Sequence, residues 1–419
     1  MSNWYKVDNV AKVFLAGHTD RDPKTMRVCC TLKEDIDPAL LQAALDESIE
    51  EIPRFQVRVR RGFFWNYIEE TDFKPVVVEE SGRPCPRLYG DGYVGVLHYR
   101  VSYFGRRINI DLFHAISDGT GLFLFLRMLV TNYLKLAHPE ELNDVSLLGT
   151  VSADETSRNG YDQFFTNSNT ATPTNILTKK SKAYHIQSRK LPYNQLQFFE
   201  VHFEADKLLK AAKSMGVSLT SYLGSQLMLS IYAEMPFIQR HRPITISLPV
   251  NLRNYYPSET MGNFFNNVEV SHTFDGSETL DTLAKEFDAT FKSHLTKEYI
   301  DLQMNRYQSI EKLFFIRMVP LFIKQPVVRA FARKESKMVT AVLSNLGPIK
   351  VPDELKPYID YFTDYCSTDR LFITITSYGN DLVLGIASAY SGTGIPRRLI
   401  KALQETGTEV TVFATDVIK

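Results

Sequence analysis

The chain has 419 residues, with 48 Lys and Arg against 48 Asp and Glu, 44% hydrophobic residues and four cysteines. This length predicts roughly two or three packing units with ample cores, and the composition excludes wholesale disorder. A formal net charge of zero argues against binding nucleic acid through the overall field of the protein, so no nucleic-acid partner is expected.

The first half of the chain predicts a mixture of strands and helices. Apolar runs and alternation predict strands, and apolar residues at helical spacing predict helices. The expected strands are Arg27–Leu32, Phe55–Arg60 paired with Phe64–Glu69, and Tyr93–Tyr103 paired with Arg107–Phe113. The expected helices run from Asp37-Pro38 to about Glu51 and from Gly119 to Leu136.

The composition changes after the second of these helices. Val151–Pro192 is rich in Ser, Thr, Asn, Lys and Gly and has no sustained period, which is typical of a linker. We therefore expect an N-terminal unit of residues 1–150, a linker of residues 151–192 and a C-terminal unit of residues 193–419.

The second half repeats the mixture, so the expected fold class is α/β (α+β), with a sheet and covering helices in each unit. The expected strands are Phe198–Phe203, Ile244–Val250, Val268–Phe274, Met338–Leu343, and the hairpin of Leu371–Tyr378 and Leu382–Tyr390. The expected helices are Ala205–Ser214, Ser218–Glu234, Glu278–Leu295, Asp301–Met318 and Pro396–Glu405. A turn at Ser344–Pro348 should follow the strand that ends at Leu343.

No targeting or membrane-spanning segment is predicted. The N-terminus has no basic segment followed by an apolar run, and the apolar stretch Leu122–Val130 is short and interrupted by Arg127. Four cysteines make no disulfide framework, and no CxxC or Cys/His cluster indicates a metal site. We therefore expect a cytoplasmic protein without a bound metal.

One stretch, DLFHAISDGTG at Asp111–Gly121, has the residues for proton transfer. His114 follows the end of an expected strand, in a short turn, and a buried helix begins after Asp118. A histidine can accept and return a proton near neutral pH if rigid elements fix its ring. The alternatives are an ordinary strand-end histidine and, for Asp118, a helix N-cap that accepts a hydrogen bond from the amide near Gly121.

Three segments together resemble the acyltransferase superfamily related to chloramphenicol acetyltransferase. They are the HxxxDG stretch from His114, the strand LPVNLR at Leu248–Arg253 followed by MGNF at Met261–Phe264, and VLSNLG at Val342–Gly347. The resemblance is nearest to the branch of alcohol acetyltransferases, polyketide-associated acyltransferases and condensation domains. Phe113 stands where condensation domains usually carry a second histidine, and the DFGWG segment of the plant enzymes is absent.

The resemblance implies two chloramphenicol acetyltransferase-like lobes with an active-site tunnel at their interface. His114 would be the general base that deprotonates a small or lipidic alcohol or amine, which attacks an acyl thioester. Asp118 would make a structural ion pair with Arg253 beside Gly119. Candidates for contact with the oxyanion or substrate are Ser344, Asn345 and Asn263.

The resemblance implies no permanently bound cofactor, because the acyl donor is a co-substrate, either acyl-CoA or an acyl carrier protein. An alternative of another class is a condensation-like protein that uses or binds an acylated carrier protein with little catalysis of its own.

The segment Lys312–Lys337 is basic and has one acid, Glu335, among many apolar residues. It fits a partly buried helix with a solvated basic edge, a tunnel wall whose cations meet the phosphates of CoA, or a basic amphipathic element at a membrane surface. Pro320 and Pro326 are expected to break any long helix here, which argues against the membrane interpretation.

Overall fold

A computed structural model describes residues 4–90, 96–145, 159–165, 181–192, 195–312 and 319–415. Two parts of the expected linker, 151–158 and 166–180, lie outside the described residues, as do residues 313–318 and the start of the strand expected from Tyr93.

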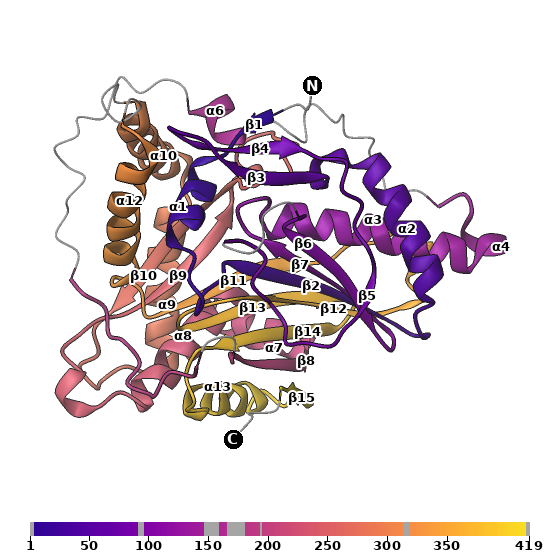
Figure 1. Ribbon diagram of the computed structural model, residues 1–419. Helices are drawn as coiled ribbons and strands as arrows, with labels where there is room; N and C mark the ends of the chain where they lie inside the picture. Colours follow the sequence, from indigo (N-terminus) through magenta and orange to yellow (C-terminus); the bar gives the residue numbers. More distant parts are fainter. Residues whose placement is uncertain are drawn as a thin grey trace.

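The N-terminal lobe is built on a five-stranded sheet with the order β12-β2-β7-β6-β5, antiparallel except for the β5–β6 pair (Figure 1). Helices α2 (Pro38–Glu51) and α3 (Gly119–Ala137) pack against each other and cover it. The strands are β2 (Thr25–Leu32), β5 (Val78–Glu79), β6 (Tyr99–Phe104), β7 (Arg107–Phe113) and β12 (Ile359–Cys366).

A small antiparallel sheet, β1-β4-β3, lies beside this lobe. The expected hairpin is confirmed as β3 (Val57–Arg61) and β4 (Asn66–Glu70), and β1 (Trp4–Lys6) adds a third strand. Helix α1 (Asn9–Gly17) follows β1.

The C-terminal lobe is a seven-stranded mixed sheet with the order β10-β9-β11-β13-β14-β8-β15. Its own apolar core lies between this sheet and covering helices that include α8 and α9. The strands are β8 (Gln197–Glu204), β9 (Ile244–Asn251), β10 (Phe265–His272), β11 (Ala341–Pro348), β13 (Leu371–Tyr378), β14 (Asp381–Ser388) and β15 (Val410–Ala414). The helices of this half are α7 (Ala205–Ser214), α8 (Leu219–Ala233), α9 (Leu280–His294), α10 (Lys297–Lys312), α12 (Leu321–Ser336) and α13 (Gly394–Gln404). The short helices α4 (Pro139–Leu142) and α6 (Gly160–Phe164) lie between the lobes in sequence.

Strand β12 joins the lobes, since it belongs to the C-terminal half of the sequence but pairs with β2 in the N-terminal sheet. It also packs on the C-terminal sheet, where the hydroxyl of Thr374 donates a 2.6 Å hydrogen bond to the Asp364 carbonyl oxygen. A Cβ on Gly385 would lie 1.9 Å from that same oxygen, so only glycine allows β14 to come this close. An ion pair of 2.6 Å between Arg107 and Glu200 adds a polar link between the two sheets.

Two sequence expectations are wrong in detail. The turn expected at Ser344–Pro348 lies inside β11, which continues to Pro348 with an irregular register between Asn345 and Gly347. The second concerns Pro326, which lies inside the continuous 16-residue helix α12 rather than ending a helix. A proline removes one backbone donor, and the helix tolerates that loss here because other contacts hold α12 in place.

Candidate active site

His114 stands directly after β7, in the turn that leads to α3. Its backbone amide donates a 2.8 Å hydrogen bond to the Lys24 carbonyl, which fixes the main chain at the strand end. The imidazole packs against the Phe14 ring of α1, with 4.4 Å between centroids, and against Phe265 of β10 at 5.9 Å. Both lobes therefore restrict the ring, while the residue remains partly exposed.

The hydrogen bonds of His114 define its tautomer. The Nδ1 atom lies 3.0 Å from the Ser117 carbonyl oxygen and 3.1 Å from Oδ1 of Asn263. Both partners are acceptors, so Nδ1 must carry the proton and Nε2 keeps its lone pair. Burial also lowers the pKa of His114 below its usual value, which keeps the imidazole neutral near neutral pH. The arrangement gives a neutral base with a fixed orientation.

Asn263 is oriented in turn by two acceptors. Its Nδ2 donates to the His114 carbonyl oxygen at 3.0 Å and to Oδ2 of Asp8 at 3.2 Å. Since the Nδ2 side faces two oxygens, Oδ1 must be the atom that faces the imidazole. Asp8 caps α1 by accepting a hydrogen bond of 2.7 Å from the Ala11 amide. Burial raises the pKa of Asp8 to about 6, against the opposing effect of these hydrogen bonds.

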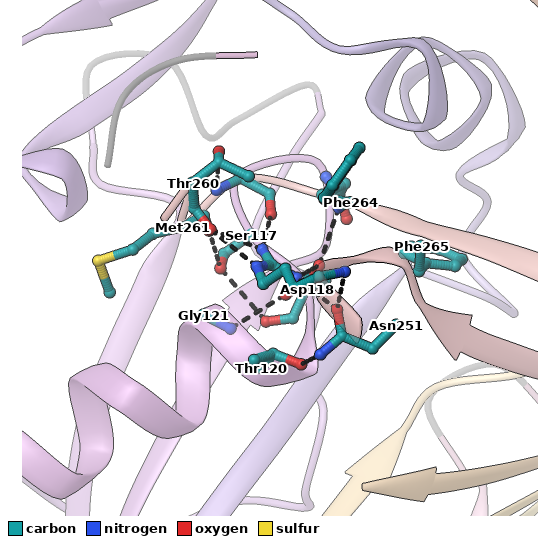
Figure 2. Close-up of polar contacts among 12 residues, drawn as sticks. Ser117, Asp118, Thr120, Gly121, Asn251, Thr260, Met261, Phe264 and Phe265 are labelled. Carbon is teal, nitrogen blue, oxygen red and sulfur yellow. Dashed lines mark hydrogen bonds and ion pairs between the residues drawn. The ribbon is translucent and has the colours of Figure 1, made fainter. Parts of the chain in front are cut away.

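Asp118 is at once the N-cap of α3 and the centre of an inter-lobe network (Figure 2). Its Oδ1 accepts a hydrogen bond of 3.0 Å from the Gly121 amide. Its Oδ2 accepts one of 2.9 Å from the Phe264 amide and pairs with Nη1 of Arg253 at 2.8 Å. The carboxylate is nearly fully buried and its lone pairs are directed at these three donors. Its contacts therefore stabilise the junction of the two lobes.

Arg253 is held by oxygens of its own segment as well. Its guanidinium donates to the carbonyl oxygen of Thr260 twice, at 3.0 and 2.7 Å, to that of Gly262 at 2.8 Å and to Oδ1 of Asn251 at 3.2 Å. Oxygens of the segment between β9 and β10 thus surround this planar group, and the segment places Asn263 next to His114.

The three motif segments meet where the lobes touch. Asn251 at the end of β9 donates a 3.2 Å hydrogen bond to Thr120, and the Ser117 hydroxyl donates one of 2.5 Å to the Met261 carbonyl. A Cβ on Gly119 would lie 3.0 Å from the Leu346 side chain of β11, so glycine lets the third segment approach the first.

Strand β11 carries two of the predicted site residues, Ser344 and Asn345. Neither makes a hydrogen bond with His114. Asn345 donates to the Thr220 hydroxyl at 2.9 Å and accepts from the Gly347 amide at 2.8 Å. Ser344 is half-buried on the same strand. Their contact with an oxyanion or substrate stays a prediction.

The sequence reasoning missed Asp8, Phe14 and Phe265. Asp8 followed by Asn9 at the start of a helix is a capping signal that could have been found, but its link to Asn263 arises only from the fold. Within the described residues no group of three or more His, Cys, Asp or Glu is arranged to hold a metal ion. No helix in the described part of the chain is both long and apolar enough to cross a bilayer.

Comparison with known proteins identifies the fold. No family model matches the sequence, and no curated protein does. Among solved structures, the chain is similar to polyketide synthase associated protein 5 from Mycobacterium tuberculosis, with a TM-score of 0.63 and 14% identity over 95% of this chain and 96% of that one.

Two other solved structures are also similar. The first condensation domain of the calcium-dependent antibiotic synthetase, in complex with a substrate analogue, gives a TM-score of 0.67 and 14% identity over 97% of each chain. TRI101 of F. sporotrichioides, complexed with coenzyme A and T-2, gives a TM-score of 0.65 and 12% identity over 98% of this chain and 100% of that one. The expectation from the three motifs is confirmed: the chain has the two-lobed α/β fold shared by condensation domains and the chloramphenicol acetyltransferase-like acyltransferases.

Proposed function

We propose that this protein is an acyltransferase that moves an acyl group from a thioester, acyl-CoA in the first instance, to a hydroxyl or amine acceptor. The observation that carries the proposal is the tautomer of His114. Its Nδ1 faces two acceptor oxygens, so the neutral Nε2 is the atom left to take a proton.

The reaction needs one base and no covalent enzyme intermediate. Nε2 of His114 removes the proton from the acceptor O–H or N–H as the oxygen or nitrogen attacks the thioester carbonyl carbon. A tetrahedral oxyanion forms, its collapse breaks the C–S bond, and the imidazolium returns the proton to the leaving thiolate. Ser117 and Asn263 hold the ring throughout, because the proton on Nδ1 stays hydrogen bonded to them.

The other predicted residues take different roles in this proposal. Asp118 and Arg253 hold the lobes and the turn of His114 together and touch neither reactant. Asn263 is a positioning residue, since both hydrogens of its amide are donated within the protein. Ser344 and Asn345 remain candidates for hydrogen bonds to the oxyanion.

The direct test is the release of CoA thiol from acyl-CoA in the presence of a panel of alcohols and amines. Wild-type protein should release thiol in an acceptor-dependent way, and His114→Ala should lose most of this activity. The matched control is His241→Ala, because His241 is exposed and its Nδ1 contacts only a local carbonyl. A His114→Ala variant with an unchanged rate would refute the mechanism.

The donor can be tested separately from the chemistry. A carrier-protein thioester presents the same carbonyl and leaving sulfur as acyl-CoA, and one of the similar folds is a condensation domain. Turnover of an acylated carrier protein without turnover of acyl-CoA would assign the donor to a carrier. Capture of the acylated carrier without any turnover would support the binding alternative instead.

A further inference from the structure

Helix α12 turns a row of bulky apolar side chains toward solvent. Phe322 is 60% exposed and Val327 66%, and Ile323 and Phe331 are exposed as well. Phe63, in the turn between β3 and β4, extends this surface with 66% exposure. We call these five side chains the apolar ridge, and a monomeric protein rarely leaves such a group uncovered without a use for it.

The other side of α12 is fixed to the N-terminal lobe, so the apolar ridge cannot turn inward. The Leu321 amide donates a 2.8 Å hydrogen bond to the Phe63 carbonyl oxygen. Nζ of Lys324, a nearly fully buried residue, lies 3.3 Å from the centroid of the Trp65 ring. Arg329 donates through Nε to the Ala16 carbonyl of α1 at 2.9 Å.

The exposed side of α12 becomes basic toward its C-terminal end. Arg333, Lys334 and Lys337 are all exposed there, and Glu335 is the only acid in the helix and is half-buried. The chain as a whole has no net charge, so this positive end is a local feature of the helix.

We propose that α12 and the β3–β4 turn dock the protein on the surface of a bilayer that contains anionic lipids. Interfacial helices of peripheral proteins combine an apolar face that enters the acyl boundary with cations that meet the headgroups. The apolar ridge and the three cations supply both parts. Helix α12 stands at the edge of the molecule (Figure 1).

This surface lies close to the candidate site. Helix α12 packs on α1, and Phe14 of α1 contacts the His114 ring. Docking would therefore bring lipid within one helix of His114. The inference does not depend on acyl transfer, because vesicle binding is measured without an acyl donor.

The test is co-sedimentation of the full chain with vesicles of phosphatidylcholine alone or mixed with phosphatidylglycerol. The wild type should bind the mixed vesicles, and a triple variant Phe322→Ser, Val327→Ser and Phe331→Ser should lose at least about tenfold in vesicle partitioning. The matched control is Phe237→Ser with Ile238→Ser, a pair that is still more exposed and also lies beside a cation, Arg240, but belongs to the separate turn Phe237–Gln239. This control should bind as the wild type does, and an unchanged urea midpoint shows that each variant is folded.

The basic residues are tested by replacing Arg333, Lys334 and Lys337 with Gln. This variant should lose the preference for phosphatidylglycerol and the weakening of binding by salt. The proposal is overturned if the wild type does not sediment with the mixed vesicles, or if the control pair matters as much as the ridge. It is equally overturned if an acidic carrier protein binds this face while vesicles do not.

Discussion

Replacing Asp118 with Ala should destabilise the protein and slow acyl transfer together. The substitution removes the N-cap of α3, the partner of Arg253 and the acceptor for the Phe264 amide in one step. These contacts join the turn that carries His114 to the opposite lobe. Loss of stability and loss of rate should therefore have the same cause.

The magnitude follows from the burial of the pair. Breaking a buried ion pair by removing one partner costs about 3–5 kcal/mol, and loss of an N-cap costs about 1 kcal/mol. Arg253 keeps its oxygen partners at Thr260, Gly262 and Asn251, so its charge is not left without compensation. We therefore expect a loss of about 3 kcal/mol in the free energy of unfolding for Asp118→Ala. Asp118→Asn retains one acceptor and should lose about 2 kcal/mol.

The assay is urea unfolding of both variants next to their rate of CoA release. The matched control is Asp281→Ala, which breaks an exposed helical ion pair with Lys285 and should leave both quantities unchanged. A large drop in rate for Asp118→Ala at an unchanged free energy of unfolding would refute the structural role. It would place Asp118 in the chemistry instead.

Four further predictions concern the site and its surroundings. His114→Ala should reduce the rate of thiol release by about 10²–10⁴-fold without loss of folding, as measured by thiol release and by the urea midpoint. Asn263→Ala should lower the rate by up to about a hundredfold, because Nδ1 loses one of its two acceptors, and an unchanged rate would remove Asn263 from the orientation of the base. Gly121→Ala should reduce the soluble yield and the urea midpoint, since a Cβ there would lie 2.4 Å from backbone and side-chain oxygens, whereas Gly17→Ala meets nothing and should be tolerated. Burial lowers the pKa of His202, but two adjacent carboxylates outweigh it and raise that pKa from 6.5 to about 9. The stabilisation by protonated His202 should therefore be complete below pH 6.5 and be lost as the pH rises through 9, and His202→Gln should flatten this part of the profile of unfolding free energy against pH.

Local patterns were sufficient to predict most of the strands and helices. The boundaries Ala205–Ser214 and Leu371–Tyr378 agree residue for residue with α7 and β13, because a clear period is bounded by turn residues there. The strand at Ile359–Cys366 was missed. Its sequence, IDYFTDYC, places Asp364 in the buried part of the strand, where burial raises the pKa of that carboxyl to about 8. An acid that the fold keeps protonated gives no strand signal in the sequence.

The effect of Pro326 on the helix at Leu321–Ser336 was mispredicted for a related reason. Pro326 is a strong local signal against a helix, but α12 gains contacts from Trp65, Ala16 and Phe63, all of the other lobe. These tertiary contacts offset the loss of one backbone donor. The error bears on the proposed docking surface, because a broken helix argued against the membrane interpretation, whereas the continuous helix carries the exposed apolar side chains on which the proposal rests.

The candidate site shows the same division between local and distant information. HxxxD predicted His114 and Asp118 because five adjacent residues carry the pattern, and the cap on Gly121 follows from the helix that begins there. The line from Asp8 through Asn263 to His114 joins residues separated by 255 and 149 positions in the sequence. Pairwise contacts of this kind depend on how the lobes meet, and no property of one short segment encodes them.

The contacts that hold the two lobes together also fix the orientation of the His114 ring. Asp118 and Ser117 hold the segment between β9 and β10, and that segment returns Asn263 to Nδ1 of His114. Displacement of either lobe would therefore remove Asn263 from Nδ1 and leave the Ser117 carbonyl as its remaining acceptor. Nε2 takes part in none of these hydrogen bonds, so it is the ring atom left to accept the proton in the reaction that we propose.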